Sequence, residues 1–496
     1  MSKVYLVGAG PGDPLLITVK GRQVLERADA VLYDHLANEA LLHLAPRSAD
    51  RIYVGKKRAD HAVTQEEITS LMIERARAGQ TVVRLKGGDP YLFGRGGEEA
   101  EALHEAGVDF EVVPGVTSPS GIAAYTGVPL THREHTSVVT FVTGHHAGAV
   151  DWARVSAAET LVILMGITAV DDIAAKLIQA GRAPDTPAMA VRWGTRPMQT
   201  VITSTLVELP ARIHESGMKP PATIIIGEVV RLRDKLNWFE RLPLFGQRIV
   251  VTRAAEQAGE LTARLWSLGA EAVELATIAF EPPTDTAPLD AAIANLESYD
   301  WLIFTSANGV RFFLERLDAS ARDLRAIRAR LCAIGPATSS ALERLHLKVD
   351  LMPRDFVAES LLEAFSGTPL EGKRILLPRA AVARDLIPTE LTRLGAHVDV
   401  VEAYQTVTPE FAHEHAREVF TTKPDWILFT STSTVNNFIS AAGRNAIEGV
   451  KVATIGPITS DAARRRGIEV TVEASPYTID GLVDKIVSYN RLSLET

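Results

Sequence analysis

The stretch VVRLKGGDPYLFGRGGEEAEAL, residues 82–103, joins a strand to a helix through a glycine-rich turn. Its apolar start predicts the strand, and the charged segment near Gly97 predicts the start of the helix. Such units build α/β folds, and the loops that follow their strands often carry function. The residue order lacks the G-x-x-x-x-G-K-[ST] pattern, so the turn is not a phosphate-binding P-loop.

A second glycine-rich turn follows the first strand, in VYLVGAGPGDPLL at residues 4–16. A dinucleotide-binding turn needs G-x-G-x-x-G, but Asp13 occupies the third glycine position. Pro11 also lacks the N–H that would face a pyrophosphate. Asp34, which ends the next strand AVLYD, nevertheless lies near the spacing of a ribose-binding acid. This turn alone therefore leaves nicotinamide binding open.

Strands and helices alternate through the first half of the chain. The segment TQEEITSLMIERARAGQ predicts a helix that begins with a capping box of Thr64 and Glu67 and ends at Gly79. After the strand DFEVVPG the sequence turns to small residues, and the strands VVTFVTG, TLVILMG, PAMAVRW and PATIIIG follow. We therefore expect an α/β fold with two lobes that meet near residues 114–117.

Composition limits the classes of partner. The 496 residues predict about three or four domains. A net charge of −9 argues against general nucleic-acid binding, although a local basic pocket could still hold an anionic small molecule. The single cysteine, Cys332, excludes an intrachain disulfide. The first strand begins by Val4 with no room for a signal peptide, and the apolar runs are shorter than the roughly 20 residues of a membrane span. We expect a cytoplasmic protein without a membrane or nucleic-acid partner.

The second half contains an internal repeat. GQRIVVTRA recurs as GKRILLPRA after 126 residues, DWLIFTSANGVRFF as DWILFTSTSTVNNF after 125, and AIGPATSSALERL as TIGPITSDAARRR after 121. Three segments in one order at nearly one period indicate a duplication, each copy predicting a lobe with a parallel sheet. Residues 233–248, charged and aromatic with one proline, are the best candidate for a linker before this repeat.

The strands of the repeat end in TSANG, GPATS, TSTST and GPITS. Loops of this kind at helix N-termini can hold carboxylates through their N–H groups. They can equally be ordinary helix caps, because Ser, Thr and Asn are preferred at that position. Four such loops together favour a cleft between two lobes that binds a polyanion.

The motifs KGGDPYLFGRGGEE, VGAGPGDP, LYDHL, YVGK, VPGVTS, GVPLTHR and VTGH occur in one order between about residues 3 and 240. With them, the first half strongly resembles uroporphyrinogen-III C-methyltransferases of the tetrapyrrole methylase family. The second half, about residues 246–487, resembles uroporphyrinogen-III synthase through VTRA, FTSANGVRFF, AIGPAT, FVAESL, AYQTV and TIGPITS.

The two resemblances imply two modules. They are a two-lobed methylase at residues 1–240, with lobes at about 1–114 and 115–240, and a synthase at residues 246–496. The synthase would be a duplicated, flavodoxin-like pair of parallel-sheet lobes, lobe A at about 246–282 plus 407–496 and lobe B at about 283–406. By analogy with such methyltransferases, we expect a homodimer. The second module would make what the first consumes.

The resemblance implies S-adenosyl-L-methionine as methyl donor, with S-adenosyl-L-homocysteine as product. This donor has no pyrophosphate, which removes the need for the third glycine of the first turn and tolerates Pro11. The residues implied to line its site are Pro11, Gly87, Gly88, Asp89, Leu92, Thr117, Ser118, Met165 and Gly194. Without the resemblance, Met165 would be interpreted as a flexible filler of the core.

The resemblance implies acid and base roles for Asp34 and Lys56. Without it, we would interpret Asp34 as a turn aspartate and Lys56 as a solvated lysine. The tetrapyrrole substrate is a polycarboxylate, so Arg95 and Arg133 are candidates to bind it, because arginine suits bidentate carboxylate contacts. Glu98 could accept pyrrole N–H groups, or simply be a charged residue in the first turn of a helix.

For the synthase, Tyr404 is the candidate general acid, and Ser306, Thr338 and Thr459 are candidates for binding hydroxymethylbilane. A core tyrosine and helix caps are the plainer alternatives. No HExxH motif occurs, so we expect no metal.

The leading hypothesis is an enzyme that closes hydroxymethylbilane to uroporphyrinogen III and methylates it twice, to precorrin-2 for sirohaem or cobalamin. The alternatives are a methyltransferase for a later corrin precursor, a second half that senses tetrapyrroles without turnover, and a nicotinamide enzyme.

Overall fold

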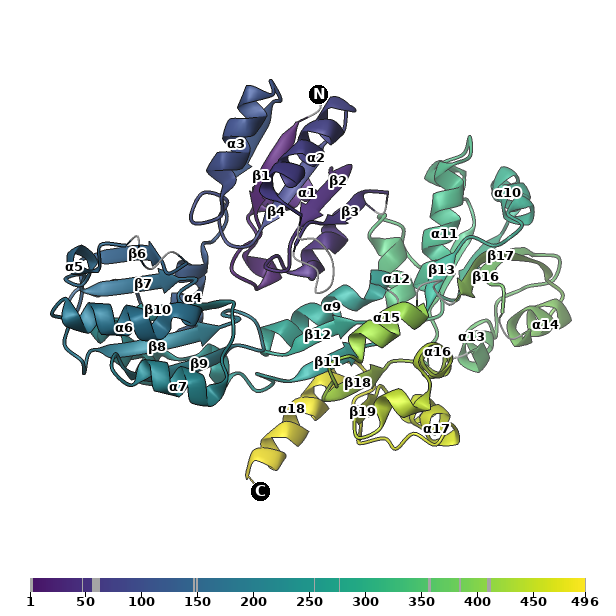
Figure 1. The fold of residues 1–496 in the computed structure, drawn as a ribbon. Coiled ribbons are helices and arrows are strands. Elements are labelled where there is room, and N and C mark those ends of the chain that lie inside the picture. The colour runs from purple at the N-terminus through teal and green to yellow at the C-terminus, as the bar shows by residue number, and fades with distance from the viewer. Residues whose placement is uncertain are drawn as a thin grey trace. The chain divides into compact units, whose positions relative to one another are not determined.

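The computed structural model describes residues 3–46, 48–55, 63–145, 148, 150–253, 255–275, 277–355, 358–382, 385–407 and 412–495. The chain forms two compact units (Figure 1). One comprises residues 1–249 with 263–272 and 487–496, and the other residues 250–262 with 273–486. Within the described ranges, no helix combines the length and the apolar character that a bilayer span requires.

The first lobe is built on a five-stranded parallel sheet with the order β3-β2-β4-β1-β5. Its strands are β1 (Val4–Gly8), β2 (Ala30–Tyr33), β3 (Asp50–Tyr53), β4 (Val82–Lys86) and β5 (Phe110–Val113), and its helices are α1 (Val19–Leu25), α2 (Gln65–Arg77) and α3 (Gly96–Glu105). The capping box of Thr64 and Glu67 is present on α2, as predicted.

The two faces of β4 differ in chemistry. Val83 and Leu85 pack into one core cluster, whereas Val82 packs with apolar residues of α2 and α3 in another. Because strand side chains alternate, Arg84 and Lys86 point to the same side as Val82. Both charged residues are buried. They lie on the face of β4 that packs against α2 and α3, two helices that Figure 1 shows beside this sheet.

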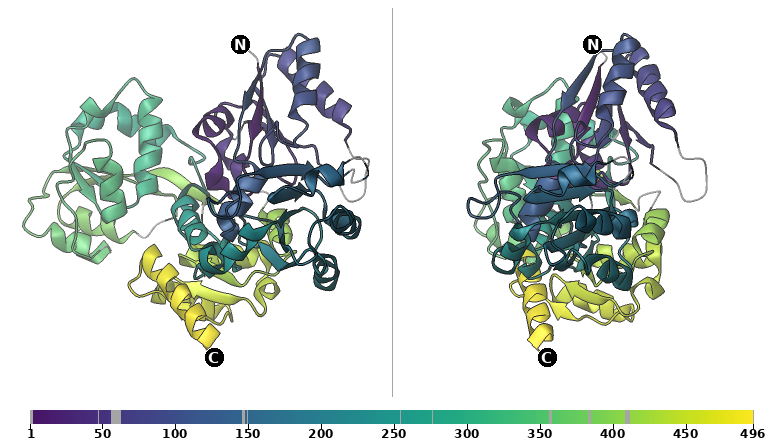
Figure 2. Two further views of the ribbon diagram at one scale, coloured as in Figure 1. Left: turned by 90° about the vertical axis from the view of Figure 1, so that its left-hand side faces the viewer. Right: turned by 60° about the vertical axis from the view of Figure 1, so that its left-hand side comes forward.

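The second lobe carries a mixed sheet with the order β6-β7-β10-β8-β9, in which only β6 and β7 pair in parallel. Its strands are β6 (Val139–Thr143), β7 (Thr160–Leu164), β8 (Pro187–Arg192), β9 (Thr200–Thr205) and β10 (Ala222–Ile226), and its helices are α4 (Ser118–Thr126), α5 (Trp152–Val155), α6 (Val170–Gln179) and α7 (Leu209–Ser216). Figure 2 shows the strands and helices of each lobe from two further sides.

The first part of the predicted linker is folded. It begins with α8 (Arg233–Leu236), and Trp238 Nε1 donates to the Ala124 carbonyl oxygen at 2.9 Å. Phe239 is buried and contacts Tyr125 edge-on. This segment therefore packs on α4 as part of the first unit and is not an extended tether.

The second half contains two further five-stranded sheets. One has the order β12-β11-β18-β19-β20 and the other β13-β17-β16-β14-β15. The strands are β11 (Arg248–Val251), β12 (Glu271–Glu274), β13 (Ala279–Glu281), β14 (Trp301–Phe304), β15 (Arg330–Ala333), β16 (Arg374–Ala380), β17 (His397–Val407), β18 (Trp426–Phe429), β19 (Lys451–Thr454) and β20 (Val472–Glu473). The segments of the sequence repeat form matching elements, since β14 and β15 pair in parallel as β18 and β19 do.

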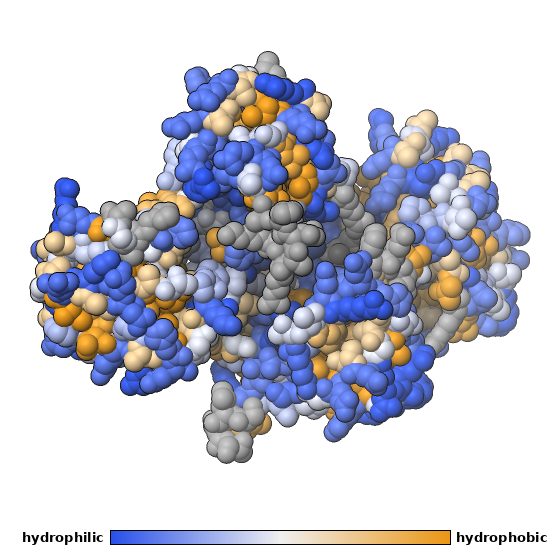
Figure 3. All heavy atoms as spheres, viewed as in Figure 1, coloured by the Kyte–Doolittle hydropathy of each residue, from blue (hydrophilic) through white to orange (hydrophobic). Residues whose placement is uncertain are grey.

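The helices of this half follow the same alternation. They are α9 (Ala255–Ser267), α10 (Ala287–Ala294), α11 (Ala307–Asp318), α12 (Pro336–Glu343), α13 (Ala358–Ala364), α14 (Leu386–Arg393), α15 (Ala412–Val419), α16 (Thr432–Ala442), α17 (Pro457–Arg465) and α18 (Ile479–Glu495). One expectation fails locally, because β13 pairs antiparallel with β17 in a sheet predicted to be parallel. Hydrophilic residues cover most of the surface visible in Figure 3.

Three glycines bring the carboxyl ends of β1, β4 and β5 together. A Cβ atom on Gly115 would lie 2.3 Å from the Gly88 carbonyl oxygen and 2.7 Å from the Gly8 Cα atom. The backbones of Gly10 and Gly88 also exchange two hydrogen bonds, at 3.2 and 2.7 Å. No side chain fits between these turns, so glycine is required there.

We predict that Gly115→Ala lowers the free energy of unfolding of the first unit by about 1–3 kcal/mol or more, because backbone must move to admit the methyl group. Gly97→Ala is the matched control, since a Cβ atom there meets nothing within 4 Å. Urea denaturation followed by circular dichroism measures both. Equal stability of Gly115→Ala and the wild type would contradict the close contact.

Candidate active sites

Predicted donor-binding residues and the predicted acid or base Asp34 lie at one edge of the first lobe's sheet. Pro11 follows β1, Asp34 follows β2, Gly87 to Leu92 follow β4, and Thr117 follows β5. The carboxyl ends of parallel strands form the usual ligand-binding edge of an open α/β sheet. The chain fold thus gathers residues that are more than 100 positions apart in the sequence.

Asp89 shapes the loop after β4. Its Oδ1 atom accepts hydrogen bonds from the backbone N–H groups of Tyr91 and Leu92, at 2.8 and 3.2 Å. Its Oδ2 atom accepts one from the Gly115 N–H group at 3.0 Å. The Asp89 carboxylate therefore joins its own loop to the end of β5, a contact that the sequence did not predict.

The second lobe contributes Met165 and Gly194 to the predicted donor site. Met165 has a φ of 55° and is 47% exposed, so it is not a filler of the core. Gly194 is buried against Ile122 of α4, where a Cβ atom would lie 2.4 Å from the Ile122 Cγ1 atom. Thr117 is the N-cap of α4 but makes no capping bond with its side chain.

Backbone strain concentrates in the loops of this half. Among the described non-glycine residues, Phe93, Arg95, Met165, Trp193, Thr195 and His346 have positive φ. All of these except His346 lie within three residues of a predicted site residue. Such conformations cost about 1–3 kcal/mol each and persist where the surrounding structure enforces them, often at ligand sites.

Asp34 is held by two donors. Its Oδ1 atom accepts from the Leu36 N–H group at 3.0 Å, and its Oδ2 atom accepts from Arg84 Nη2 at 3.0 Å. The side chain of Asp34 is 21% exposed, whereas that of Arg84 is 5% exposed. The carboxylate therefore stands between a buried cation and the open edge of the sheet.

Behind Asp34 lies a charge cluster formed by Arg84, Lys86, Glu99 and Gln65, which the sequence reasoning missed. Glu99 is fully buried, and its Oε1 atom accepts from Lys86 Nζ at 2.9 Å, from Gln65 Nε2 at 2.8 Å and from Arg84 Nε at 3.4 Å. The sequence contained one indication of this cluster, because Arg84 and Lys86 lie two positions apart in a strand whose other residues are apolar. Buried charges of this kind need a counterion, which Glu99 provides.

Burial governs the electrostatics of this cluster. The pKa of Lys86 is lowered, mainly because burial penalises its charged form and secondly because Arg84 is close. The pKa of Tyr53, on β3, is raised by burial and then by the negative charge of Asp34. The Oε2 atom of Glu99 is buried without a hydrogen-bond partner.

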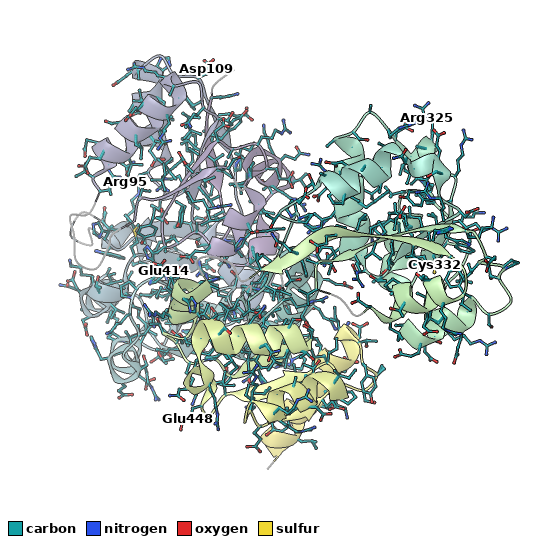
Figure 4. The ribbon with its side chains drawn as sticks, turned by 90° about the vertical axis from the view of Figure 1, so that its right-hand side faces the viewer. Arg95, Asp109, Arg325, Cys332, Glu414 and Glu448 are labelled. Carbon is teal, nitrogen blue, oxygen red and sulfur yellow. The ribbon has the colours of Figure 1, made fainter. Side chains whose placement is uncertain are left out.

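The predicted substrate-binding residues are exposed. Arg95 is the N-cap of α3, and its Nε atom donates to Glu98 Oε2 at 2.6 Å. Figure 4 shows Arg95 and Asp109 at opposite ends of that helix. Arg133 lies on an exposed turn, and Lys56 lies outside the described residues. The structure thus brings Arg95 and Glu98 together as an ion pair.

The turn around Arg133 bears on the expected absence of a metal. The ligand atoms of His132, Glu134 and His135 lie within 4.8 Å of one another. His132 Nδ1, however, accepts a hydrogen bond from the Glu134 N–H group at 3.2 Å, which in the neutral imidazole places the proton on Nε2. The absence of a metal stays a prediction.

Direct contacts join the two lobes of the methylase half at this site. The Tyr125 hydroxyl of α4 donates to Asp13 Oδ2 at 2.6 Å, and the Asp13 N–H group donates to Thr195 Oγ1 at 3.0 Å. Gly121 of α4 packs against Pro11, where a Cβ atom would lie 2.4 Å from the Pro11 Cγ atom. Pro11 and Asp13 of the first turn are thus fixed by the second lobe.

In the second half, the structure brings Ser306 and Tyr404 together. Their hydroxyl oxygens are 3.0 Å apart, and Ser306 also caps α11 by accepting from the Gly309 N–H group at 3.0 Å. Tyr404 stacks on Phe312 with ring centroids 5.7 Å apart. The tyrosine is 7% exposed and therefore largely packed in the core.

The other two candidate hydroxyls are less accessible. Thr338 and Thr459 lie in the first turns of α12 and α17, and both are buried. The N-caps of these helices are Gly335 and Gly456, not hydroxyl residues. Cys332 is buried as well (Figure 4), and burial raises the pKa of its thiol to about 12.

Comparison with known proteins assigns both halves. The model of the tetrapyrrole (corrin/porphyrin) methylases matches residues 3–210, and that of the uroporphyrinogen-III synthase HemD matches residues 259–484. A porphyrin biosynthesis protein HemD of Ruminiclostridium josui is 37% identical over 491 residues, which are 98% of this chain and 97% of the relative. A siroheme synthase of Azotobacter vinelandii is 53% identical over 48% of this chain, and the match spans about half of that relative (53%).

Solved structures resemble each half separately. A uroporphyrin-III C-methyl transferase of Thermus thermophilus, complexed with S-adenyl homocysteine, is 44% identical over 46% of this chain and 99% of its own, with a TM-score of 0.41. A mutant uroporphyrinogen III synthase of Thermus thermophilus is 19% identical over 50% of this chain and all of its own, with a TM-score of 0.38.

The chain belongs to the family of porphyrin biosynthesis proteins in which a tetrapyrrole methylase is followed by a uroporphyrinogen-III synthase HemD. It is a tetrapyrrole biosynthesis enzyme with a methyltransferase half and a synthase half, both of mixed α/β structure. The resemblance found in the sequence is thereby confirmed.

Tyr125→Phe tests the contact between the lobes. Burial first, and then the hydrogen bond to Asp13, raise the pKa of Tyr125, so the folded state keeps a proton that the unfolded state loses above pH 10. We predict that the variant is less stable by about 1.5–3 kcal/mol at neutral pH. The difference should shrink as pH rises above 10 through the folded pKa. Urea denaturation at several pH values measures it, and a constant difference would contradict the assignment.

Proposed function

We propose that the chain cyclises hydroxymethylbilane to uroporphyrinogen III, with inversion of ring D, and then methylates C2 and C7 to give precorrin-2 for sirohaem or cobalamin. The observation that carries this proposal is the pairing of the two families in one chain. The product of the synthase is then the substrate of the methyltransferase that precedes it. Residues 246–496 would thus make the uroporphyrinogen III that the methylase half then uses as its substrate.

The glycine turns fit S-adenosyl-L-methionine as the methyl donor. The contacts among Gly8, Gly88 and Gly115 keep side chains out of the edge where the donor would lie, and thus leave backbone groups free to approach it. The residues that would hold it are Pro11, Gly87, Gly88, Asp89, Leu92, Thr117, Ser118, Met165 and Gly194. The donor supplies an electrophilic methyl group and leaves as S-adenosyl-L-homocysteine.

Asp34 suits the role of base in this proposal. Arg84 and the Leu36 N–H group both donate to its carboxylate and fix its position at the sheet edge. A carbon-methylated pyrrole must lose a proton, and a partly exposed carboxylate at the sheet edge can take it. Lys56 would share the acid and base work, as its motif implies.

The exposed arginines would bind the carboxylates of the tetrapyrrole. Arg95 and Arg133 supply guanidinium groups suited to bidentate contacts. Glu98 now pairs with Arg95, so substrate carboxylates would compete for that arginine and release Glu98 toward pyrrole N–H groups. Besides these small molecules, the proposed partner is a second copy of the chain in a homodimer.

In the synthase half, residues 246–496, the Ser306–Tyr404 pair would assist departure of the terminal hydroxyl of hydroxymethylbilane. The Tyr404 hydroxyl donates a proton, the C–O bond breaks, and water leaves. Thr338 and Thr459 would bind the chain while it closes. The repeated strand–helix segments support a duplicated, flavodoxin-like pair of lobes, at about 246–282 plus 407–496 and at 283–406. β13 departs from these bounds, because it pairs with β17 in the sheet of the lobe at 283–406.

Asp34→Asn tests the first reaction. Loss of a general base predicts a fall in the rate of methyl transfer of about 10²–10⁴-fold. Transfer of labelled methyl from S-adenosylmethionine to uroporphyrinogen III measures it. Asp29→Asn is the control, since Asp29 precedes the amino end of β2 and accepts from the Thr81 N–H group. A full rate in Asp34→Asn would exclude the base role, and no transfer by the wild type would overturn the reaction itself.

Tyr404→Phe tests the second reaction. We expect uroporphyrinogen III formation to fall by about 10²-fold, with the I isomer increasing because the chain closes unaided. Tyr299→Phe is the control, because Tyr299 donates to Asp399 at 2.7 Å in the same lobe and has no proposed role. The products are oxidised, and the amounts of the I and III isomers are measured after separation. Wild-type protein that yields only the I isomer would favour the non-catalytic, tetrapyrrole-sensing alternative.

A further inference from the structure

Arg196 connects three loops of the methylase half. It follows β8 in the second lobe, and its Nη2 atom donates to the Leu36 carbonyl oxygen of the first lobe at 3.2 Å. Its stem lies against Gly12, where a Cβ atom would be 2.8 Å from the Arg196 Cγ atom. Its guanidinium carbon lies 4.8 Å from the ring centroid of Trp193. One side chain thus contacts the turn after β1, the loop after β2 and its own loop.

Leu36 links this contact to Asp34. The Leu36 N–H group donates to Asp34 Oδ1, while its carbonyl oxygen accepts from Arg196. On its other side, the Cβ atom of Leu36 would be 2.6 Å from a Cβ atom on Gly87. Arg84 therefore holds the Asp34 carboxylate directly, whereas Arg196 holds it indirectly, through the backbone of Leu36.

The loop that carries Arg196 is itself fixed. Trp193 and Thr195 both have positive φ, at 52° and 68°. The Thr195 N–H group donates to Gln199 Oε1 at 3.0 Å, and Gln199 Nε2 donates to Glu240 Oε1 at 2.8 Å. A loop constrained by this many bonds can hold a side chain in a defined place.

We propose that Arg196 is a positioning residue for methyl transfer: it sets the loop that carries Asp34 against the turn after β1. This inference rests on the proposed methyltransferase function. Arg196 is held in place by its contacts with Gly12, Leu36 and Trp193, which adjoin predicted site residues but are not themselves among them. Its loss should therefore affect the rate constant of the reaction more than the binding of either substrate.

The test compares Arg196→Met, which keeps the stem and removes the donors, with Arg196→Lys, which keeps one donor and the charge. We expect Arg196→Met to lower kcat for methyl transfer to uroporphyrinogen III by about 10–100-fold, as small displacements of a reacting group do. The KM for S-adenosylmethionine should change by less than about threefold, and Arg196→Lys should recover much of the lost kcat.

Arg182→Met is the matched control. Arg182 is a partly buried arginine of the same lobe whose Nη1 atom donates to the carbonyl oxygens of Ser156 and Ala158 at 3.1 and 2.7 Å. It contacts none of the three loops through these bonds. Its replacement should lower stability yet leave kcat per folded molecule unchanged.

Hydrogen exchange provides a readout that needs no activity. In Arg196→Met, the peptide covering residues 33–41 should exchange faster than in the wild type and in Arg182→Met. Unchanged exchange there, or an unchanged kcat in Arg196→Met, would overturn the positioning role. A wild type that transfers no methyl group would instead overturn the proposed function, and exchange of residues 33–41 would still report on Arg196. If Arg196→Met does not fold, Arg196→Gln, which removes the charge and shortens the side chain, is judged by the same two readouts, with Arg196→Lys as the variant expected to recover.

Discussion

The close contact of three glycine backbones at the ends of β1, β4 and β5 is the constraint on which the proposed methyl-donor site depends. Gly115 and Gly88 approach so closely that a single methyl group has no space between them. This contact sets the turn that bears Pro11 and the loop that bears Asp89 side by side. The Asp89 carboxylate then closes the arrangement by accepting the Gly115 N–H group. Because backbone atoms form this edge of the sheet, its shape depends on glycine more than on any reactive side chain.

The second constraint is the burial of charge behind that edge. Arg84 and Lys86 occupy buried strand positions that usually hold apolar residues. Glu99 of α3 compensates their positive charge and accepts a hydrogen bond from each. Removing one member of a buried cluster is costly because it leaves an unpaired charge. The cluster therefore fixes Arg84, and Arg84 in turn donates a hydrogen bond to the Asp34 carboxylate. The hydrogen bond from Arg84 to Asp34 therefore connects the buried charge cluster with the residue proposed as the base.

Local patterns in the sequence predicted local structure well. The capping box of Thr64 and Glu67 and the strand–helix repeat of the second half are present in the fold. The pairing of Glu99 with Arg84 and Lys86, the antiparallel strand β13 and the contact of Arg196 with Leu36 were not predicted. Each depends on which elements pack together, which spacing along one chain does not specify. Motif order indicated the two families, whereas the contacts that hold the proposed site residues were visible only in the packed structure.

The most direct test of the two proposed reactions supplies the purified full chain with hydroxymethylbilane, with and without S-adenosylmethionine, and resolves the oxidised products by mass and isomer. We predict the III isomer alone without the donor and a dimethylated III product with it. The I isomer alone without the donor, or a III product that stays unmethylated with it, would contradict a chain that performs both reactions.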